Sequence, residues 1–446
     1  MAYGPAECSE SGSPFPVPSV LLSSYFSPFY VQDSIADAHN LLDVMPLGGN
    51  SNKAPVVSGG GCIDSLPDGV LEHMLGFLEA REAVRTCVLA RRWRYLWMSA
   101  TGLRIVYTTY EGKVDYLTAM RKYRQFVDCL LDCRGQAPLE TCEISFEGLC
   151  DDDDRPCLNR WIRHITCRVQ MFRLSNVCRE DFELDDLPLV SRHLTRLELD
   201  GMELSNSFFD FSSCPSLEHL EIATCFLWEA NMIMSESIKR LSITNCFFGF
   251  HTHVNVPNLV SLRLDSHLYR APVIERMPAL QEAYVRVGRE NPNSADCDDE
   301  DCYSCHGVLR GDNKKCVLLE CLSESENMAL ISESKTFIFG RDLNKCPIFS
   351  KLKTLLLNES WCVAPEFSAL TCILKNTPVL GKLTLQLFSK GPKHKVEMIG
   401  RFNSMERSAA ISEHLKTIEI KCEVVDEEVN EILKFLCTLN ICFIFK

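Results

Sequence analysis

Positive charge is scarce at the start of this chain, whose first lysine or arginine is Lys53. Secretion signals and organellar transit peptides need early basic residues, so we expect neither. Long apolar runs are also missing, since none approaches the roughly 20 residues of a membrane-spanning helix. We therefore expect a reducing location in the cytoplasm and/or nucleus, no membrane partner, and free thiols among the 24 cysteines.

Basic residues are outnumbered along the whole chain, with 46 against 60 acidic residues and a net charge of −14. Nucleic-acid-binding domains need a clustered basic surface, so we expect no nucleic-acid partner. The sequence also lacks a P-loop, a dinucleotide-binding glycine motif, an HExxH zinc motif and a GxSxG nucleophile motif. We therefore predict no catalytic residue, no cofactor and a non-enzymatic role.

The most informative segment that is present reads IDSLPDGVLEHMLGFLEAREAVRTCVLARRWRYLWMSATGLRI, from Ile63 to Ile105. Its apolar residues recur at helical spacing in three stretches, which predicts three short amphipathic helices. A segment this small leaves much of its surface exposed, so some of these side chains should meet another element or another chain. Periodicity alone fits a helical subdomain packed on its neighbour equally well.

Specific residues in this segment resemble the F-box of plant F-box proteins with leucine-rich repeats. They are the Leu66-Pro67 pair, the aliphatic series that follows it, and the stretch from Val88 to Trp97, although Ala90 stands where the family often has serine. The resemblance implies docking to a Skp-type adaptor of an SCF ubiquitin ligase and, through it, to a cullin scaffold. The adaptor-binding residues that it implies are Leu66, Pro67, Val70, Leu71, Leu75, Leu78, Val88 and Trp97.

An L-x-x-L-x-L pattern recurs after this segment. Its copies at Leu194, Leu217, Ile238, Leu259 and Leu280 are spaced by 23, 21, 21 and 21 residues, inside the period of about 20–29 typical of leucine-rich repeats. Further copies begin at Leu139, Val169, Leu352, Leu380 and Leu415. Because one such unit cannot bury its apolar side alone, we predict an α/β fold: a three-helix F-box, a leucine-rich-repeat solenoid (horseshoe) and a C-terminal capping region.

Two details of the repeats suggest roles for single residues. Cys225 and Cys246 follow the last aliphatic position by three places, where the repeat pattern has Asn or Cys to bridge the turn. Strand alternation places the third and fifth positions on the concave face, where mixed charge suits a protein partner, although a merely solvated face fits too. The predicted target-binding residues are Arg173, Arg196, Glu198, His219, Glu221, Arg240, Arg263 and Tyr284.

An acidic segment that contains cysteine interrupts the repeats after residue 290. Cys302 and Cys305 have zinc-ligand spacing, and Cys297 or Cys316, or His306 as a substitute, could extend the set. A disordered loop explains the acidic composition better, so no metal is predicted. The expected divisions are a disordered tail (1–61), the F-box (62–104), repeats (105–290), the acidic loop (291–316), further repeats (317–410) and a C-terminal repeat or cap resembling the FBD region (411–446).

These features together predict a substrate-recognition subunit of an SCF-type E3 ubiquitin ligase. The F-box would bind the adaptor, and the repeats would bind an unknown target protein. Two alternatives stay open: a scaffold that binds the adaptor without degradation, and a small-molecule-dependent co-receptor that uses the concave face.

Overall fold

The computed structural model describes most of the chain from Ile63 onward. The described residues are 63–107, 116–146, 154–177, 184, 188–204, 206–248, 252–267, 272–288, 318–332, 342–343, 346–363, 367–387, 414–423, 425–437 and 443–445. The predicted tail (1–61) and acidic loop (291–316) lie outside them, together with Cys297, Cys302, Cys305, His306 and Cys316. Within the described part, no helix is long and apolar enough to cross a membrane, and no three His, Cys, Asp or Glu residues are grouped to hold a metal.

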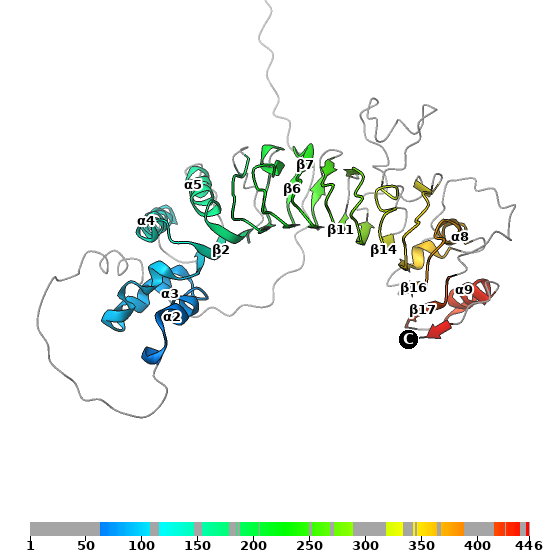
Figure 1. Ribbon diagram of the computed structural model, residues 1–446, viewed down its shortest axis with the longest axis horizontal. Helices are drawn as coiled ribbons and strands as arrows, with labels where there is room; N and C mark the ends of the chain where they lie inside the picture. Colours follow the sequence, from blue (N-terminus) through cyan, green and yellow to red (C-terminus); the bar gives the residue numbers. More distant parts are fainter. Residues whose placement is uncertain are drawn as a thin grey trace, which may run out of the picture. The chain divides into compact units, whose positions relative to one another are not determined.

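A parallel sheet of 13 strands dominates the described structure, and its strands follow one another in chain order (Figure 1). In that order they are β1 (Gly102–Tyr107), β2 (Leu139–Phe146), β3 (Val169–Asn176), β4 (Arg196–Asp200), β5 (His219–Ala223), β8 (Arg240–Thr244), β11 (Ser261–His267), β13 (Glu282–Gly288), β14 (Asn327–Ser332), β15 (Thr354–Asn358), β16 (Lys382–Leu387), β17 (Thr417–Cys422) and β18 (Phe443–Phe445). The predicted mixed α/β class is therefore confirmed.

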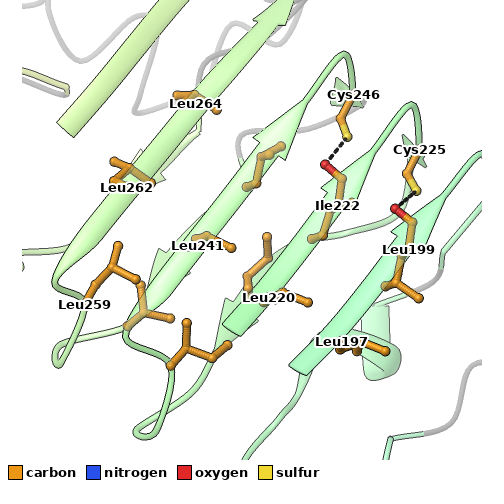
Figure 2. Close-up of a cluster of buried hydrophobic side chains, with 14 of the residues drawn as sticks. Leu197, Leu199, Leu220, Ile222, Cys225, Leu241, Cys246, Leu259, Leu262 and Leu264 are labelled. Atoms are coloured by element: carbon orange, nitrogen blue, oxygen red, sulfur yellow. Dashed lines mark hydrogen bonds between the residues drawn. The ribbon is translucent and has the colours of Figure 1, made fainter. Parts of the chain in front are cut away.

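Each central strand buries one face. In β4, β5 and β8 the second and fourth residues are buried, whereas the first, third and fifth are at least partly exposed. The register aligns Leu197 with Leu220 and Leu241, and Figure 2 shows these side chains among the buried aliphatic residues of successive strands. Burying such a side chain contributes about 1.5–3 kcal/mol, and each strand obtains that burial from its neighbours.

Two cysteines join neighbouring strands where the chain turns away from the sheet (Figure 2). The Cys225 thiol can donate to the carbonyl oxygen of Leu199 at 3.7 Å or to that of Ala223 at 3.2 Å, and the Cys246 thiol can donate to that of Ile222 at 3.5 Å or to that of Thr244 at 3.3 Å. Burial raises the pKa of the Cys225 thiol, so the thiol keeps the proton that it donates. Both cysteines thus lie at the turn where the repeat pattern places a bridging residue, within reach of the neighbouring strand.

The turns that follow β5 and β8 have the same backbone geometry. Thr224 and Asn245 have φ values of 50° and 52°, in the left-handed region. Directly after these turns, β6 (Phe226–Leu227) and β9 (Phe247–Phe248) pair in parallel. A third sheet contains β7 (Met232–Met234), β10 (His253–Asn255) and β12 (Val273–Ile274). The backbone thus repeats along with the sequence period.

Helices connect several of the parallel strands. They are α4 (Tyr116–Arg134) between β1 and β2, α5 (Asp154–Thr166) between β2 and β3, α8 (Ser368–Lys375) between β15 and β16, and α9 (Glu427–Cys437) between β17 and β18. The backbone N–H of Val429 donates to Asp426 Oδ1 at 3.0 Å and so caps the start of α9. The end of the chain thus forms a strand, a helix and a strand, β17, α9 and β18.

The segment before β1 is helical but differs from the three predicted helices. It contains η1 (Ile63–Ser65), α2 (Asp68–Leu75), α3 (Ala80–Arg85), η2 (Thr86–Val88), η3 (Arg91–Arg94) and η4 (Leu96–Ser99). The third predicted helix thus occurs as two short 3-10 helices. Extended backbone at Ala90 (φ −160°, ψ 163°) precedes η3, and non-helical Tyr95 (φ −122°) separates η3 from η4.

Three strands of the sheet, β1, β14 and β18, do not correspond to a copy of the repeat pattern. β1 begins at Gly102, inside the segment predicted to be the F-box, and pairs with β2 along its whole length. β14 has the sequence NMALIS, in which Met328, Leu330 and Ser332 are buried, so its pattern is weaker than L-x-x-L-x-L. In the structure, buried and more exposed residues alternate along most of β1 and along the whole of β14.

Leu220→Ala should lower the apparent free energy of unfolding by about 2–5 kcal/mol, because it opens a cavity between three aligned strands. Urea denaturation followed by circular dichroism measures the change. Leu89→Ala is the control, because Leu89 is 67% exposed and should lose less than about 0.5 kcal/mol. Equal effects of the two substitutions would contradict the burial described here.

Candidate functional site

The helical segment before β1 exposes an unusual number of large apolar side chains. We call them the apolar surface set: Val70, Met74, Phe77, Leu78, Val88, Leu89 and Tyr95, each at least 40% exposed. Val70 and Met74 lie four residues apart on α2 and share one side of it, and Phe77 and Leu78 lie in the turn that follows the helix. Exposed apolar patches of this kind mark interaction sites in soluble proteins.

Arg92 holds the two parts of this segment together. Its Nε donates to Asp68 Oδ1 at 2.8 Å, and its Nη2 donates to the carbonyl oxygen of Leu66. Asp68 lies in the first turn of α2, where a carboxylate is favoured by the helix dipole. The start of α2 and η3 are therefore fixed to each other, which positions the exposed side chains on either side of them.

Arg134, at the end of α4, connects the helical segment to the sheet. Its guanidinium is buried and donates to the carbonyl oxygens of Trp97 at 2.7 Å and Ala100 at 2.6 Å. Burial lowers the pKa of Arg134 to about 10, so the group remains charged at neutral pH. These charge-assisted hydrogen bonds terminate η4 directly before β1.

The backbones of α2 and β1 also meet closely at two glycines. A Cβ atom added to Gly76 would lie 2.6 Å from the backbone nitrogen of Gly102, and one added to Gly102 would lie 2.6 Å from the carbonyl oxygen of Gly76. Only glycine fits at this crossing. Arg104 of β1 adds a hydrogen bond from Nη1 to the carbonyl oxygen of Phe77 at 3.1 Å.

Ion pairs cross the outward face of the sheet from β3 to β5. Arg196 contacts Glu198 at 2.5 Å and Glu221 at 3.5 Å, and Arg173 contacts Glu198 at 3.7 Å. Exposed ion pairs of this kind contribute about 0–1 kcal/mol each, so they orient side chains more than they stabilise the fold. This part of the face is largely neutralised by its own residues.

His219 of β5 lies between Arg196 and Arg240 in the register. Partial burial and the two flanking arginines lower the pKa of His219 below its ordinary value. The imidazole is therefore neutral near pH 7, and the positive charge in this row belongs to the arginines.

Comparisons with known proteins agree with the residues described above. No protein-family model matches the chain. An F-box/LRR-repeat protein of Arabidopsis thaliana is 26% identical over 376 residues, which cover 73% of this chain and 68% of the relative. MEIOTIC F-BOX protein MOF of Oryza sativa subsp. japonica is 28% identical over 397 residues, 80% of each chain.

This chain is a relative of plant F-box/LRR-repeat proteins. The resemblance predicted from the sequence is confirmed. A putative FBD-associated F-box protein of Arabidopsis thaliana is also similar, with 22% identity over 75% of this chain and 76% of the relative. From here on, residues 63–99, which lie within the predicted F-box (62–104), are called the F-box segment.

The eight residues predicted to bind an adaptor occupy two different environments in the F-box segment. Pro67, Val70, Leu78 and Val88 are exposed, and Leu66 is half-buried. Leu71, Leu75 and Trp97 are buried, with exposed fractions of 0%, 2% and 5%. These three form the core behind the surface in the chain by itself, and contact of any of the eight residues with an adaptor stays a prediction.

The prediction also missed exposed members of the apolar surface set. Phe77 and Leu89 are more exposed than any of the predicted residues Val70, Leu78 and Val88, and Met74 and Tyr95 fall within their range. The helical period of α2 carries the signal for Met74, which lies four residues after Val70. Leu89 and Tyr95 lie at turns, where periodicity gives no sign of exposure.

The eight predicted target-binding residues all lie on the outward face of the sheet, which confirms the predicted strand alternation. Arg173, Arg196, Glu198 and Glu221 are joined by the ion pairs described above. Arg240 lies in register beside His219, and the guanidinium carbon of Arg263 lies 4.5 Å from the ring centroid of Tyr284. Contact of these residues with a target stays a prediction.

Arg134→Met should lower the apparent free energy of unfolding by about 2–4 kcal/mol, because it leaves two buried carbonyl oxygens without their charged donor. Thermal or urea unfolding measures this loss. Arg121→Met on the exposed side of α4 removes the same charge and should change stability by less than about 0.5 kcal/mol. A similar result for both variants would mean that Arg134 does not join the F-box segment to the sheet.

Proposed function

We propose that this chain is the substrate-recognition subunit of an SCF-type E3 ubiquitin ligase. In this proposal residues 62–104 form an F-box that binds a Skp-type adaptor and, through it, a cullin scaffold. Residues 105–290 and 317–410 form a leucine-rich-repeat solenoid, and residues 411–446 form its C-terminal cap. The solenoid binds a target protein, and the chain supplies no catalytic residue.

The apolar surface set is the observation that supports this proposal most strongly. Phe77, Val88 and Leu89 are each more than 60% exposed, although the adjoining segment has a well-formed core. Leaving them in water costs free energy that a partner's apolar surface would recover. Similarity to proteins named for their F-box makes a Skp-type adaptor the favoured partner.

Five arginines of the F-box segment suit the same partner. The segment contains five arginines and five acidic residues, so its charge is balanced in a chain of net charge −14. The arginines are Arg81, Arg85, Arg91, Arg92 and Arg94, and the acidic residues are Asp64, Asp68, Glu72, Glu79 and Glu82. An acidic adaptor would be repelled less here than elsewhere on the chain. Such complementarity affects orientation and association rate more than affinity.

Ubiquitin transfer would be accelerated by proximity alone. A target held on the sheet face keeps its lysines near a charged ubiquitin-conjugating enzyme, and this raises their effective concentration. We place this activity in the cytoplasm and/or nucleus. The reducing conditions there keep thiols such as Cys225 and Cys246 available as hydrogen-bond donors.

Val88→Glu should reduce capture of a purified Skp-type adaptor at least about tenfold, because a carboxylate would be buried against an apolar partner. Val190→Glu is a closely matched control, since Val190 is 62% exposed, Val88 is 63% exposed and Val190 lies outside the F-box segment. Binding is measured by biolayer interferometry. Circular dichroism of both variants checks that they remain folded.

Unchanged adaptor binding by folded Val88→Glu, or an equal loss with Val190→Glu, would contradict the proposed site. A second measurement separates a ubiquitin-ligase receptor from a scaffold. Proteins that co-purify with the chain should accumulate under proteasome inhibition with the wild type and not with Val88→Glu. Adaptor binding without such accumulation would favour the scaffold.

A further inference from the structure

Three arginines lie on adjacent strands of the sheet and face outward. Arg240 is in β8, Arg263 is in β11 and Arg286 is in β13. The register aligns Arg240 with Ser261 and Arg286 with Asp265. Neighbouring strands are about 4.8 Å apart, so the side chains project from one continuous surface. We call Arg240, Arg263 and Arg286 the arginine patch.

Two of the three guanidinium groups are held in place. Arg263 contacts Asp265 at 3.1 Å, and its guanidinium carbon lies 4.5 Å from the centre of the Tyr284 ring. Arg286 contacts the same carboxylate at 2.6 Å. One carboxylate thus serves two guanidinium groups and neutralises only one of the charges, while the arginine side chains stay 51% and 40% exposed.

Arg240 adds a charge that this network does not balance. It is exposed, and no ion pair joins it to another residue in the described ranges. Its register neighbours are His219, which is neutral near pH 7, and Ser261. Glu218 lies close enough to Arg240 to interact with it electrostatically, but its carboxylate is already paired with Lys239 at 2.5 Å. On the outward face of β8, β11 and β13, the three arginines are accompanied by two carboxylates, Asp265 and Glu282, so a positive charge remains.

We propose that the arginine patch binds an acidic segment of a partner protein, one that carries several Asp or Glu side chains. Guanidinium groups bind carboxylates through two parallel hydrogen bonds, and the partly exposed hydroxyls of Ser242, Thr244 and Ser261 can donate further ones. Because Tyr284 and Asp265 already order two of the arginines, binding loses less side-chain entropy.

The contrast with the rest of the molecule defines the class of partner. A chain of net charge −14 repels an acidic segment over most of its surface, so a positive patch selects where such a segment binds. From β3 to β5, by comparison, arginine and glutamate neutralise each other. The identity of this partner as a ubiquitination target rests on the proposed function, whereas the binding chemistry does not.

Fluorescence anisotropy with labelled synthetic peptides tests the proposal on the full chain. One peptide alternates Asp and Glu with Gly and Ser, and its matched partner has Asn and Gln in place of the acids. We expect saturable binding of the acidic peptide that weakens as salt is raised and at least about tenfold weaker binding of the amide peptide. Arg240→Glu should weaken acidic-peptide binding at least about tenfold, and Arg240→Gln less.

Arg192→Glu is the control for the change in net charge. Arg192 is exposed ahead of β4, lies away from the patch and forms no ion pair with the residues that the structure describes. It should leave peptide binding within about twofold of the wild type. Circular dichroism of the three variants confirms that each is folded.

Four results would overturn the proposal: no saturable binding of the acidic peptide, equal binding of the amide peptide, an equal loss with Arg192→Glu, or binding of a phosphoserine peptide only. The last result would indicate a phosphopeptide partner instead. Adaptor capture by the same proteins is measured in parallel. If the wild type does not capture the adaptor, only the proposed function is contradicted. If a variant of the arginine patch loses peptide binding but still captures the adaptor, the loss is confined to the patch.

Discussion

The structure depends on one constraint: a single strand of this sheet cannot bury its aliphatic side chains by itself. Leu197, Leu220 and Leu241 are buried because the next unit covers each of them. Stability is therefore shared between neighbours along the whole sheet, as in other repeat architectures. Cys225 and Cys246 contribute in the same way, because their thiols lie within hydrogen-bond distance of the carbonyl oxygens of Leu199 and Ile222 on the neighbouring strands.

The same constraint separates two kinds of surface. Burial restricts the inward positions of the strands to apolar residues, whereas the outward positions accept other residue types. In the middle of the sheet, the outward positions carry charged side chains. The F-box segment is connected to this sheet by Arg134 and by the contact between Gly76 and Gly102, which leaves its apolar surface set exposed. The chain thus offers an apolar surface at one end and a charged face along the sheet.

The sequence was sufficient for features that follow from period alone. The strands β4, β5, β8 and β11 were predictable because their spacing and their aliphatic positions both repeat. β14 was not, because Ser325 and Met328 take the buried places where the pattern expects leucine. The burial of Leu71, Leu75 and Trp97 was also not predicted. Resemblance to a family shows which residues belong to a motif, but it does not show whether their side chains point inward or outward.

Charge pairing was beyond the reach of the sequence as well. Arg196, Arg240 and Arg263 look equivalent in the printed sequence, yet only the register shows that two glutamates neutralise Arg196 and that Arg263 shares Asp265 with Arg286. Pairings between residues more than twenty positions apart depend on which strands become neighbours. The difference between a neutralised and an unbalanced arginine is a property of the fold.

Hydrogen–deuterium exchange of the full chain, with and without a purified Skp-type adaptor, tests the central claim most directly. The account predicts slower exchange on adaptor binding in α2 and in the residues from Val88 to Trp97, with β4 to β13 unchanged. Protection confined to the sheet strands, or no protection in the F-box segment, would contradict it.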